Sequence, residues 1–260
     1  MNASAHIPKV ILAGAGPGDV GLITIKAVEY LKKASFILAD RLVSPEILKR
    51  YASTQAEIIY VGKHGGRESV RQEEINKLLI EYGNKDGLTV RLKGGDVAIF
   101  SNVIAEIDVL NTHNIPFEIV PGITSASGAS ASIQVPLTAR ELSKGVRFLT
   151  YYNDEHFTDG DWQNMAETTD TLVFYMSSKS LPDLIEKLKK LSKQDKALAI
   201  IEQTTTPQER VLTSTIFLFE EELRTTTINQ PAIVIIGEVV RLFPGQSEIA
   251  MQTTSFFKEH

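Results

Sequence analysis

Val10-Ile11-Leu12-Ala13-Gly14-Ala15-Gly16-Pro17-Gly18-Asp19 is the stretch that decides the fold, because an apolar run passes at once into a glycine-rich turn. This order is typical of the first strand and loop of a nucleotide-binding βαβ unit. A dinucleotide loop needs its third glycine three residues after the second, where this chain has Asp19. A carboxylate there would repel a phosphate, and Pro17 removes one backbone N–H donor. The loop is therefore predicted to approach a ligand closely, but not a pyrophosphate.

The composition is that of an ordinary globular protein. Of the 260 residues, 43% are hydrophobic and 23% are charged, and the net charge of -5 argues against nucleic acid as the main partner. There is no cysteine and the five histidines are scattered, so we expect no disulfide and no metal. No apolar run approaches the ~18 residues that span a membrane, and the start lacks a signal-peptide core. We expect a cytoplasmic protein without a membrane partner.

The first half alternates short β-branched runs with helical periodicity, which predicts an α/β fold with a mostly parallel sheet and helices on both faces. The expected strands are 10–13, 36–39, 58–61, 89–92 and 117–120. One expected helix has the apolar face Leu22, Ile25, Val28 and Leu31. Another begins at a Ser69 capping box and ends at Gly83.

The second half predicts a separate mixed-sheet α/β domain. The small residues of 125–132 indicate a tightly packed helix, with a flexible Gly/Ser linker as the alternative. Strands are expected at 147–151, 172–176, 197–201, 211–214 and 232–236, and Pro182 opens a helix between two of them. We therefore expect an N-terminal domain at 7–122, a C-terminal domain at 123–243 and a tail at 244–260.

Three glycine-bearing loops follow predicted strands of the first domain. They are Gly16-Pro17-Gly18-Asp19, Gly94-Gly95-Asp96 and Pro121-Gly122-Ile123-Thr124-Ser125. Each loop alone is equally well explained by turn geometry. Because ligands bind at the carboxyl ends of strands in open α/β sheets, the three loops together predict a cleft on one rim.

Eight motifs then follow one another in a recognisable order: the opening stretch 10–19, Asp40-Arg41-Leu42-Val43-Ser44-Pro45-Glu46, Val61-Gly62-Lys63, Arg91-Leu92-Lys93-Gly94-Gly95-Asp96, Val120-Pro121-Gly122-Ile123-Thr124, Pro136-Leu137-Thr138-Ala139-Arg140, Thr171-Leu172-Val173-Phe174-Tyr175-Met176, and the run 231–240. Over about residues 8–243 the chain resembles the tetrapyrrole methylases, and among them those that methylate uroporphyrinogen III. The resemblance implies a two-domain enzyme, usually a homodimer, that holds S-adenosylmethionine between its domains. Such an enzyme moves two methyl groups onto uroporphyrinogen III and forms precorrin-2, the branch point toward sirohaem and cobalamin, with S-adenosylhomocysteine as the other product.

The resemblance also assigns the cofactor contacts. S-adenosylmethionine carries a sulfonium and an amino-acid group but no phosphate, so a loop with Pro17 and Asp19 is compatible with it. Without the resemblance, Met176 would be core packing and Asp96 a turn former. The implied cofactor-binding residues are Pro17, Gly94, Gly95, Asp96, Ile99, Thr124, Ser125, Met176 and Thr204.

Catalytic roles follow from the resemblance in the same way. Asp40 matches a proton acceptor and Lys63 a proton donor, and a nearby Lys63 would keep Asp40 ionised. The structural alternatives are a salt bridge from Asp40 to Arg41, or a helix cap, and a solvated Lys63. The substrate carries many carboxylates, which arginines can grip in bidentate fashion. The candidates for substrate binding are Arg41, Arg67, Asn102 and Arg140.

Three positions depart from the family pattern. Asn102 stands where the family has an arginine, Thr204 stands at a loop glycine, and 132–135 replaces a glycine-bearing segment. These changes leave two alternatives open: a methylase acting on a later precorrin, and a non-catalytic protein that binds S-adenosylmethionine or a tetrapyrrole. An NAD-dependent dehydrogenase fits less well, because the glycine fingerprint is incomplete.

Overall fold

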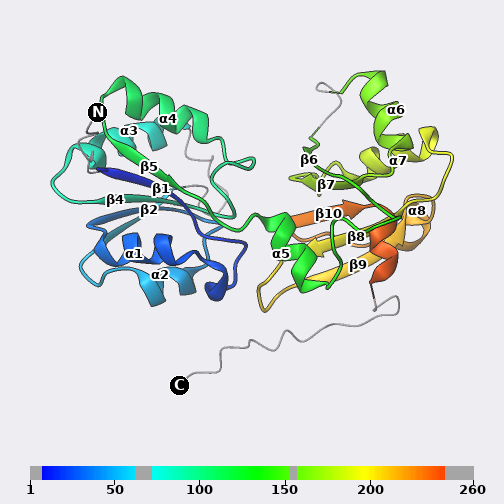
Figure 1. The fold of residues 1–260 in the computed structure, drawn as a ribbon, viewed down its shortest axis with the longest axis horizontal. Coiled ribbons are helices and arrows are strands. Elements are labelled where there is room, and N and C mark those ends of the chain that lie inside the picture. Colours follow the sequence, from blue (N-terminus) through cyan, green and yellow to red (C-terminus); the bar gives the residue numbers. More distant parts are fainter. Residues whose placement is uncertain (1–7, 62–71, 153–156, 244–260) are drawn as a thin grey trace. The chain divides into compact units, whose positions relative to one another are not determined.

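The computed structural model describes residues 8–61, 72–152 and 157–243, and the chain forms two compact units that divide between Ser125 and Ala126 (Figure 1). The expected tail at 244–260 lies outside the described residues. Within the described ranges no helix is both long and apolar enough to cross a membrane.

The first unit is built on five parallel strands, as predicted. They are β1 (Val10–Gly14), β2 (Phe36–Asp40), β3 (Glu57–Val61), β4 (Thr89–Lys93) and β5 (Phe117–Val120), in the order β3-β2-β4-β1-β5. Every residue of β1 and β4 is buried, since both faces of a parallel sheet are covered. All five strands therefore end at the same edge of the sheet, where the described loops after β1, β2, β4 and β5 lie.

Two pairs of helices cover the two faces of this sheet (Figure 1). The helices α1 (Ile25–Lys33) and α2 (Pro45–Tyr51) pack Leu31 and Ile47 against Ile11. On the other face, α3 (Gln72–Asn84) and α4 (Val103–Thr112) pack Leu79 and Leu110 against Leu12. The short helix η1 (Val20–Leu22) precedes α1. The prediction of helices on both faces is confirmed.

One predicted helix end is wrong. Helix α3 continues to Asn84, so Gly83 lies inside it and does not cap it. A Cβ at Gly83 would lie 3.0 Å from Ile115 and 3.1 Å from Val10, so glycine is needed there for close packing. The expected start at Ser69 lies outside the described residues.

The second unit has the expected mixed sheet. Its strands are β6 (Val146–Thr150), β7 (Thr171–Tyr175), β8 (Ala197–Glu202), β9 (Arg210–Thr215) and β10 (Ala232–Ile236), in the order β6-β7-β10-β8-β9. Strand β6 is parallel to β7, whereas β10 is antiparallel to both β7 and β8 and β9 is antiparallel to β8. Strands β6, β7 and β8 therefore run in one direction and end at the same edge.

Five helical segments accompany this sheet: α5 (Ser125–Ser132), α6 (Asp159–Glu167), α7 (Leu181–Leu191), α8 (Phe219–Leu223) and η3 (Glu238–Leu242). Helix α7 carries Pro182 in its first turn, as predicted, and buries Leu184 and Leu188 in a core with Phe174. Residues 125–132 are helical, with Ala126 and Ala129 fully buried, so the small-residue segment is a packed helix and not a flexible linker.

Candidate functional site

Three glycines bring the strand-end loops of the first unit into backbone contact. A Cβ added to Gly14 would lie 2.6 Å from the carbonyl oxygen of Gly95, and one added to Gly122 would lie 2.3 Å from the same atom. Gly16 and Gly95 exchange backbone hydrogen bonds of 3.1 and 2.8 Å. Gly16 and Gly95 also have φ angles of +80° and +68°, which side chains disfavour. The three loops after β1, β4 and β5, which the sequence predicts to lie on one rim, thus meet backbone to backbone.

The side chain of Asp96 connects the loop after β4 to the loop after β5. One carboxylate oxygen accepts a hydrogen bond of 2.8 Å from the backbone N–H of Ala98, and the other accepts one of 2.8 Å from Gly122. The first bond closes a local turn, and the second crosses to the loop after β5. The same loops hold four more of the predicted cofactor residues, Gly94, Ile99, Thr124 and Ser125, all half-buried.

Asp19 occupies the place where a dinucleotide would set its phosphates. Its side chain caps η1 by accepting a hydrogen bond of 2.6 Å from the N–H of Gly21. The positive end of this short helix is therefore neutralised by the chain's own carboxylate. Pro17 lies half-buried two residues before it. The local geometry supports the prediction that this loop does not bind a pyrophosphate.

Asp40 ends β2 and is held by a cation that the sequence reasoning did not assign. Its Oδ1 accepts a hydrogen bond of 2.6 Å from a guanidinium nitrogen of Arg91. Arg91 and Lys93 on β4 also bind Glu106 of α4, at 3.1 and 2.6 Å. Lys63 lies outside the described residues.

The sequence contains a signal for part of the network formed by Asp40, Arg91, Lys93 and Glu106, although the motifs above did not assign it. Arg91 and Lys93 alternate within a strand that is otherwise apolar, so they point to the same face of a sheet covered on both sides. Two cations at such positions require buried anions. Nothing in the local pattern of α4 marks Glu106 as one of those anions.

The predicted substrate residues are dispersed. Arg41 is exposed directly after β2, and Arg140 is exposed in the second unit, while Arg67 lies outside the described residues. Asn102 precedes α4 in the left-handed conformation, with φ 55°, and donates a hydrogen bond of 3.1 Å to the side chain of Gln72 at the start of α3. A neutral amide pair therefore joins the two helices where the family pattern has an arginine.

The remaining two predicted cofactor residues follow β7 and β8 in the second unit. Met176 has a φ of +56° and is 44% exposed, and the hydroxyl of Tyr152 donates a hydrogen bond to its sulfur at 2.7 Å. Gln203 and Thr205, on either side of Thr204, have φ angles of +45° and +63°. Left-handed backbone in non-glycine residues is uncommon and gathers at functional sites.

Two of the departures from the family pattern lie in contact with each other. The hydroxyls of Ser132 and Thr204 lie 3.3 Å apart, and Thr204 is only 6% exposed. Glu209 accepts hydrogen bonds from the hydroxyl of Thr204 at 3.2 Å and from the backbone N–H of Thr205 at 2.6 Å. The side chain of Thr204 thus helps to hold its own loop through Glu209.

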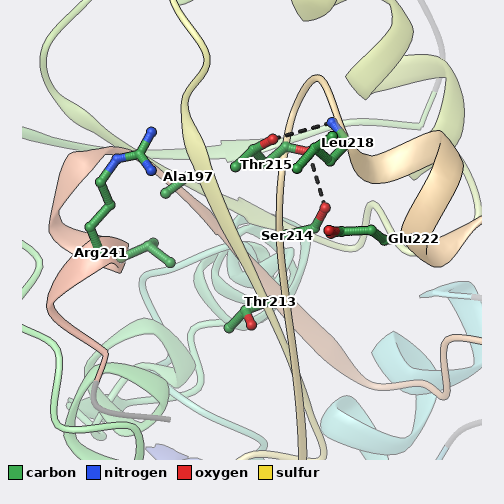
Figure 2. A pocket seen from close by; sticks show the side chains of 8 residues that line it. Ala197, Thr213, Ser214, Thr215, Leu218, Glu222 and Arg241 are labelled. Atoms are coloured by element: carbon green, nitrogen blue, oxygen red, sulfur yellow. Dashed lines mark hydrogen bonds between the residues drawn. The ribbon is translucent and has the colours of Figure 1, made fainter. Parts of the chain in front are cut away.

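A separate hollow of about 240 Å³ lies beside β9, α8 and η3 of the second unit (Figure 2). Its basic residue, Arg241, is bound to Glu238 at 2.9 Å and to the carbonyl of Asp195 at 2.8 Å. None of the predicted site residues lines this hollow. Among the described residues there is also no cluster of three or more histidine or acidic side chains suited to a metal.

Comparison with known proteins identifies similar chains across most of the sequence. The family model for Tetrapyrrole (Corrin/Porphyrin) Methylases matches residues 9–218. The siroheme synthase of Pseudomonas aeruginosa strain PAO1 is 42% identical over 92% of this chain and 52% of its own length. Siroheme synthase 2 of Aeromonas hydrophila is 41% identical over 92% of this chain and 51% of its own length. The chain therefore spans about half the length of these curated relatives.

Solved structures show the same fold. The uroporphyrin-III C-methyl transferase of Thermus thermophilus, complexed with S-adenyl homocysteine, is 34% identical, with a TM-score of 0.76 over 90% of this chain and 100% of its own. A cobalt precorrin-4 methyltransferase, 23% identical, shares the fold with a TM-score of 0.78 over 89% of this chain and 95% of its own.

Proposed function

Because this chain belongs to the tetrapyrrole methylase family, we propose that it transfers two methyl groups from S-adenosylmethionine to carbon atoms of uroporphyrinogen III and so forms precorrin-2. The relatives support this substrate, since the similar Thermus enzyme is a uroporphyrin-III C-methyl transferase and the similar curated proteins are siroheme synthases.

The observation that carries the proposal is the surface formed by the three glycine loops. Gly14 and Gly122 let the loops meet backbone to backbone, since a Cβ on either would lie within 2.6 Å of the carbonyl oxygen of Gly95, and the carboxylate of Asp19 caps η1. Such a surface offers backbone groups to a ligand without phosphates, and this fits S-adenosylmethionine. When bound, S-adenosylmethionine supplies an electrophilic methyl group.

We assign cofactor binding to two sets of residues. In the first unit these are Pro17, Gly94, Gly95, Asp96, Ile99, Thr124 and Ser125, and in the second they are Met176 and Thr204. Asp96 acts by holding the loops together, because both of its oxygens already accept backbone hydrogen bonds.

We assign the removal of the proton from the methylated ring to side chains of this protein. A pyrrole carbon attacks the methyl carbon, the carbon–sulfur bond breaks with its electron pair left on sulfur, and the methylated ring must lose a proton. Asp40 accepts that proton, since Arg91 at 2.6 Å holds its carboxylate in place and its side chain is 27% exposed. Lys63 is the proposed proton donor, and Arg41, Arg67 and Arg140 meet the carboxylates of the substrate.

Asn102 favours one second candidate, a methylase acting on a later precorrin. A neutral amide bound to Gln72 replaces a cation of the family pattern, so the set of carboxylates that the site accepts can differ.

We propose further that the protein works as a cytoplasmic homodimer, as the resemblance implies. Light scattering of the purified protein measures its mass, and a mass of one chain would contradict the dimer.

The test is an anaerobic reaction of the purified protein with S-adenosylmethionine and enzymatically made uroporphyrinogen III, followed by mass spectrometry. Gain of two methyl groups supports the proposal. Methylation of a later precorrin alone supports the second candidate, and binding of S-adenosylmethionine in calorimetry without any methylated product identifies a non-catalytic binding protein.

Asp40→Asn tests the base separately. Loss of a general base lowers turnover by about 10²–10⁴-fold. The matched control is Glu46→Gln on α2, an exposed carboxylate whose described ion pair is with Lys49 at 3.6 Å, and it should turn over as the unchanged protein does. Unchanged turnover in Asp40→Asn would remove Asp40 from the mechanism.

A further inference from the structure

Three buried charged side chains form a network with Asp40, which is the most exposed of the four. Arg91, Lys93 and Glu106 have side chains that are 1%, 4% and 0% exposed, whereas Asp40 is 27% exposed. Asp40 lies at the edge of the sheet where the glycine loops gather, and Glu106 lies beneath it on α4. Within the described residues, the network thus reaches the candidate site through Asp40.

Glu106 is the anion that binds both cations. Its Oε1 accepts from Nε of Arg91 at 3.1 Å and from Nζ of Lys93 at 2.6 Å. Arg91 in turn donates from Nη1 to the carbonyls of Leu38 and Leu92, both at 3.3 Å, and from Nη2 to Asp40. Its guanidinium is therefore held on several sides and presents a fixed direction to Asp40.

The network holds two carboxylates and two cations. Removal of one charged group leaves another uncompensated in a buried place. Burial and the charge of Arg91 lower the pKa of Lys93, and Glu106 opposes that shift. The described ionic partners of Glu106 are both on β4.

We propose that Glu106 is a positioning residue of the methyl-transfer site, which acts through Arg91 to fix the orientation of Asp40. This inference rests on the proposed function, in which Asp40 accepts a proton from the methylated ring. Glu106 binds Nε of Arg91 at 3.1 Å, and Nη2 of the same guanidinium binds Asp40 at 2.6 Å. A proton acceptor must lie within hydrogen-bond reach of the proton that it removes, so the position of Asp40 decides how well it acts.

Through Lys93, Glu106 also helps to position the loop that follows β4. Its backbone carbonyl accepts a hydrogen bond of 2.8 Å from the N–H of Ala15, and Gly94 comes next in the chain. By holding the side chain of Lys93, Glu106 steadies the end of β4, from which the Gly94-Gly95-Asp96 turn departs.

The test compares Glu106→Gln, which keeps the shape and removes the charge, with Glu118→Gln in the same unit. Glu118 also loses partners when neutralised, because it binds Lys26 and the hydroxyl of Tyr30, yet it has no described link to Asp40. We expect Glu106→Gln to lower kcat by tenfold or more and to leave the KM for each substrate within about twofold, because the lost ion pair positions the proton acceptor. Glu118→Gln should change neither.

A second readout is independent of enzymatic activity. The carboxyl carbon of Asp40, followed by NMR in protein labelled at aspartate, reports the surroundings of that side chain, and Glu106→Gln should change its chemical shift while Glu118→Gln leaves it unchanged. If the unchanged protein proves inactive while this change occurs, the proposed function fails and the structural link from Glu106 to Asp40 stands. If the protein is active but Glu106→Gln alters neither kcat nor the chemical shift of Asp40, the inference is overturned.

Should Glu106→Gln fail to fold, the charge-balanced double variant Glu106→Gln with Lys93→Met replaces it. Asp40 and Arg91 then remain as a neutral pair, so folding is expected to return. A positioning role predicts that the slow turnover and the changed chemical shift of Asp40 persist in this variant, because Arg91 still lacks its second carboxylate. Recovery of both to the values of the unchanged protein would show that Glu106 serves the fold alone.

Discussion

Replacing Gly122 by alanine puts the contact between the glycine loops to a direct test. The new Cβ would lie 2.3 Å from the carbonyl oxygen of Gly95 and 2.8 Å from Cα of Gly14, where ordinary contacts begin at 3.4 Å. Both neighbours are backbone atoms, so one loop must move by roughly 1 Å. Overpacking of this kind costs about 1–3 kcal/mol, and the same movement weakens the hydrogen bond from Gly122 to Asp96, worth about 1.5–3 kcal/mol. We expect a loss near 3 kcal/mol.

Urea unfolding measures the free energy of this change, and calorimetry with S-adenosylmethionine measures its effect on binding, which we expect to weaken at least tenfold. The matched control is Gly160→Ala in α6, where the nearest atom to the new Cβ is 3.7 Å away. Alanine there should stabilise the helix by about 0.5–1 kcal/mol. If Gly122→Ala changes the unfolding free energy by less than about 0.5 kcal/mol and leaves the affinity unaltered, the loops are not packed as described.

Three further predictions follow from described contacts. Asp96→Ala removes the acceptor of two backbone N–H groups and should weaken S-adenosylmethionine binding and destabilise the first unit by about 2 kcal/mol, measured by calorimetry and urea unfolding. Burial raises the pKa of Glu202, but hydrogen bonds from Arg210 and from Asn229 lower it by more. The contribution of Glu202 to the free energy of unfolding is therefore fully present above the ordinary pKa of 4.5 and is lost as the pH falls below it. Glu202→Gln should lose about 2 kcal/mol at neutral pH and show a flatter acid dependence, and an unchanged acid transition would contradict this. Thr204→Val and Ser132→Ala should each raise the KM for S-adenosylmethionine, and a double-mutant cycle with additive effects would show that their 3.3 Å contact carries no energy.

Much of the fold was predictable because buried strands are rich in apolar and β-branched residues. The run 89–93 is covered on both faces, and its apolar and β-branched residues show this in the sequence. Helix ends were less predictable: Gly83 is typical of a cap, yet it lies inside α3 because Ile115 packs against it. Ile115 follows a different helix, so no local pattern reports that contact.

The candidate site was also predictable only in part. The glycine loops follow strands directly, so their common edge follows from the parallel order of the sheet. The partner of Asp40 depends on β4 lying beside β2, and the partner of Thr204 depends on where α5 packs; the sequence pattern specifies neither. Arg91 and Ser132 were therefore found only in the three-dimensional arrangement.

The strand order of the first unit has a consequence for how the chain folds. Strand β1 is the first strand of this unit to be synthesised, yet its partners β4 and β5 come much later, where Val10 pairs with Thr89 and with Phe117. Such non-local pairing slows folding and leaves an apolar segment without its neighbours while the chain emerges from the ribosome. The opening run Val10-Ile11-Leu12-Ala13 is thus the segment of this unit that must be kept from aggregating for longest during synthesis.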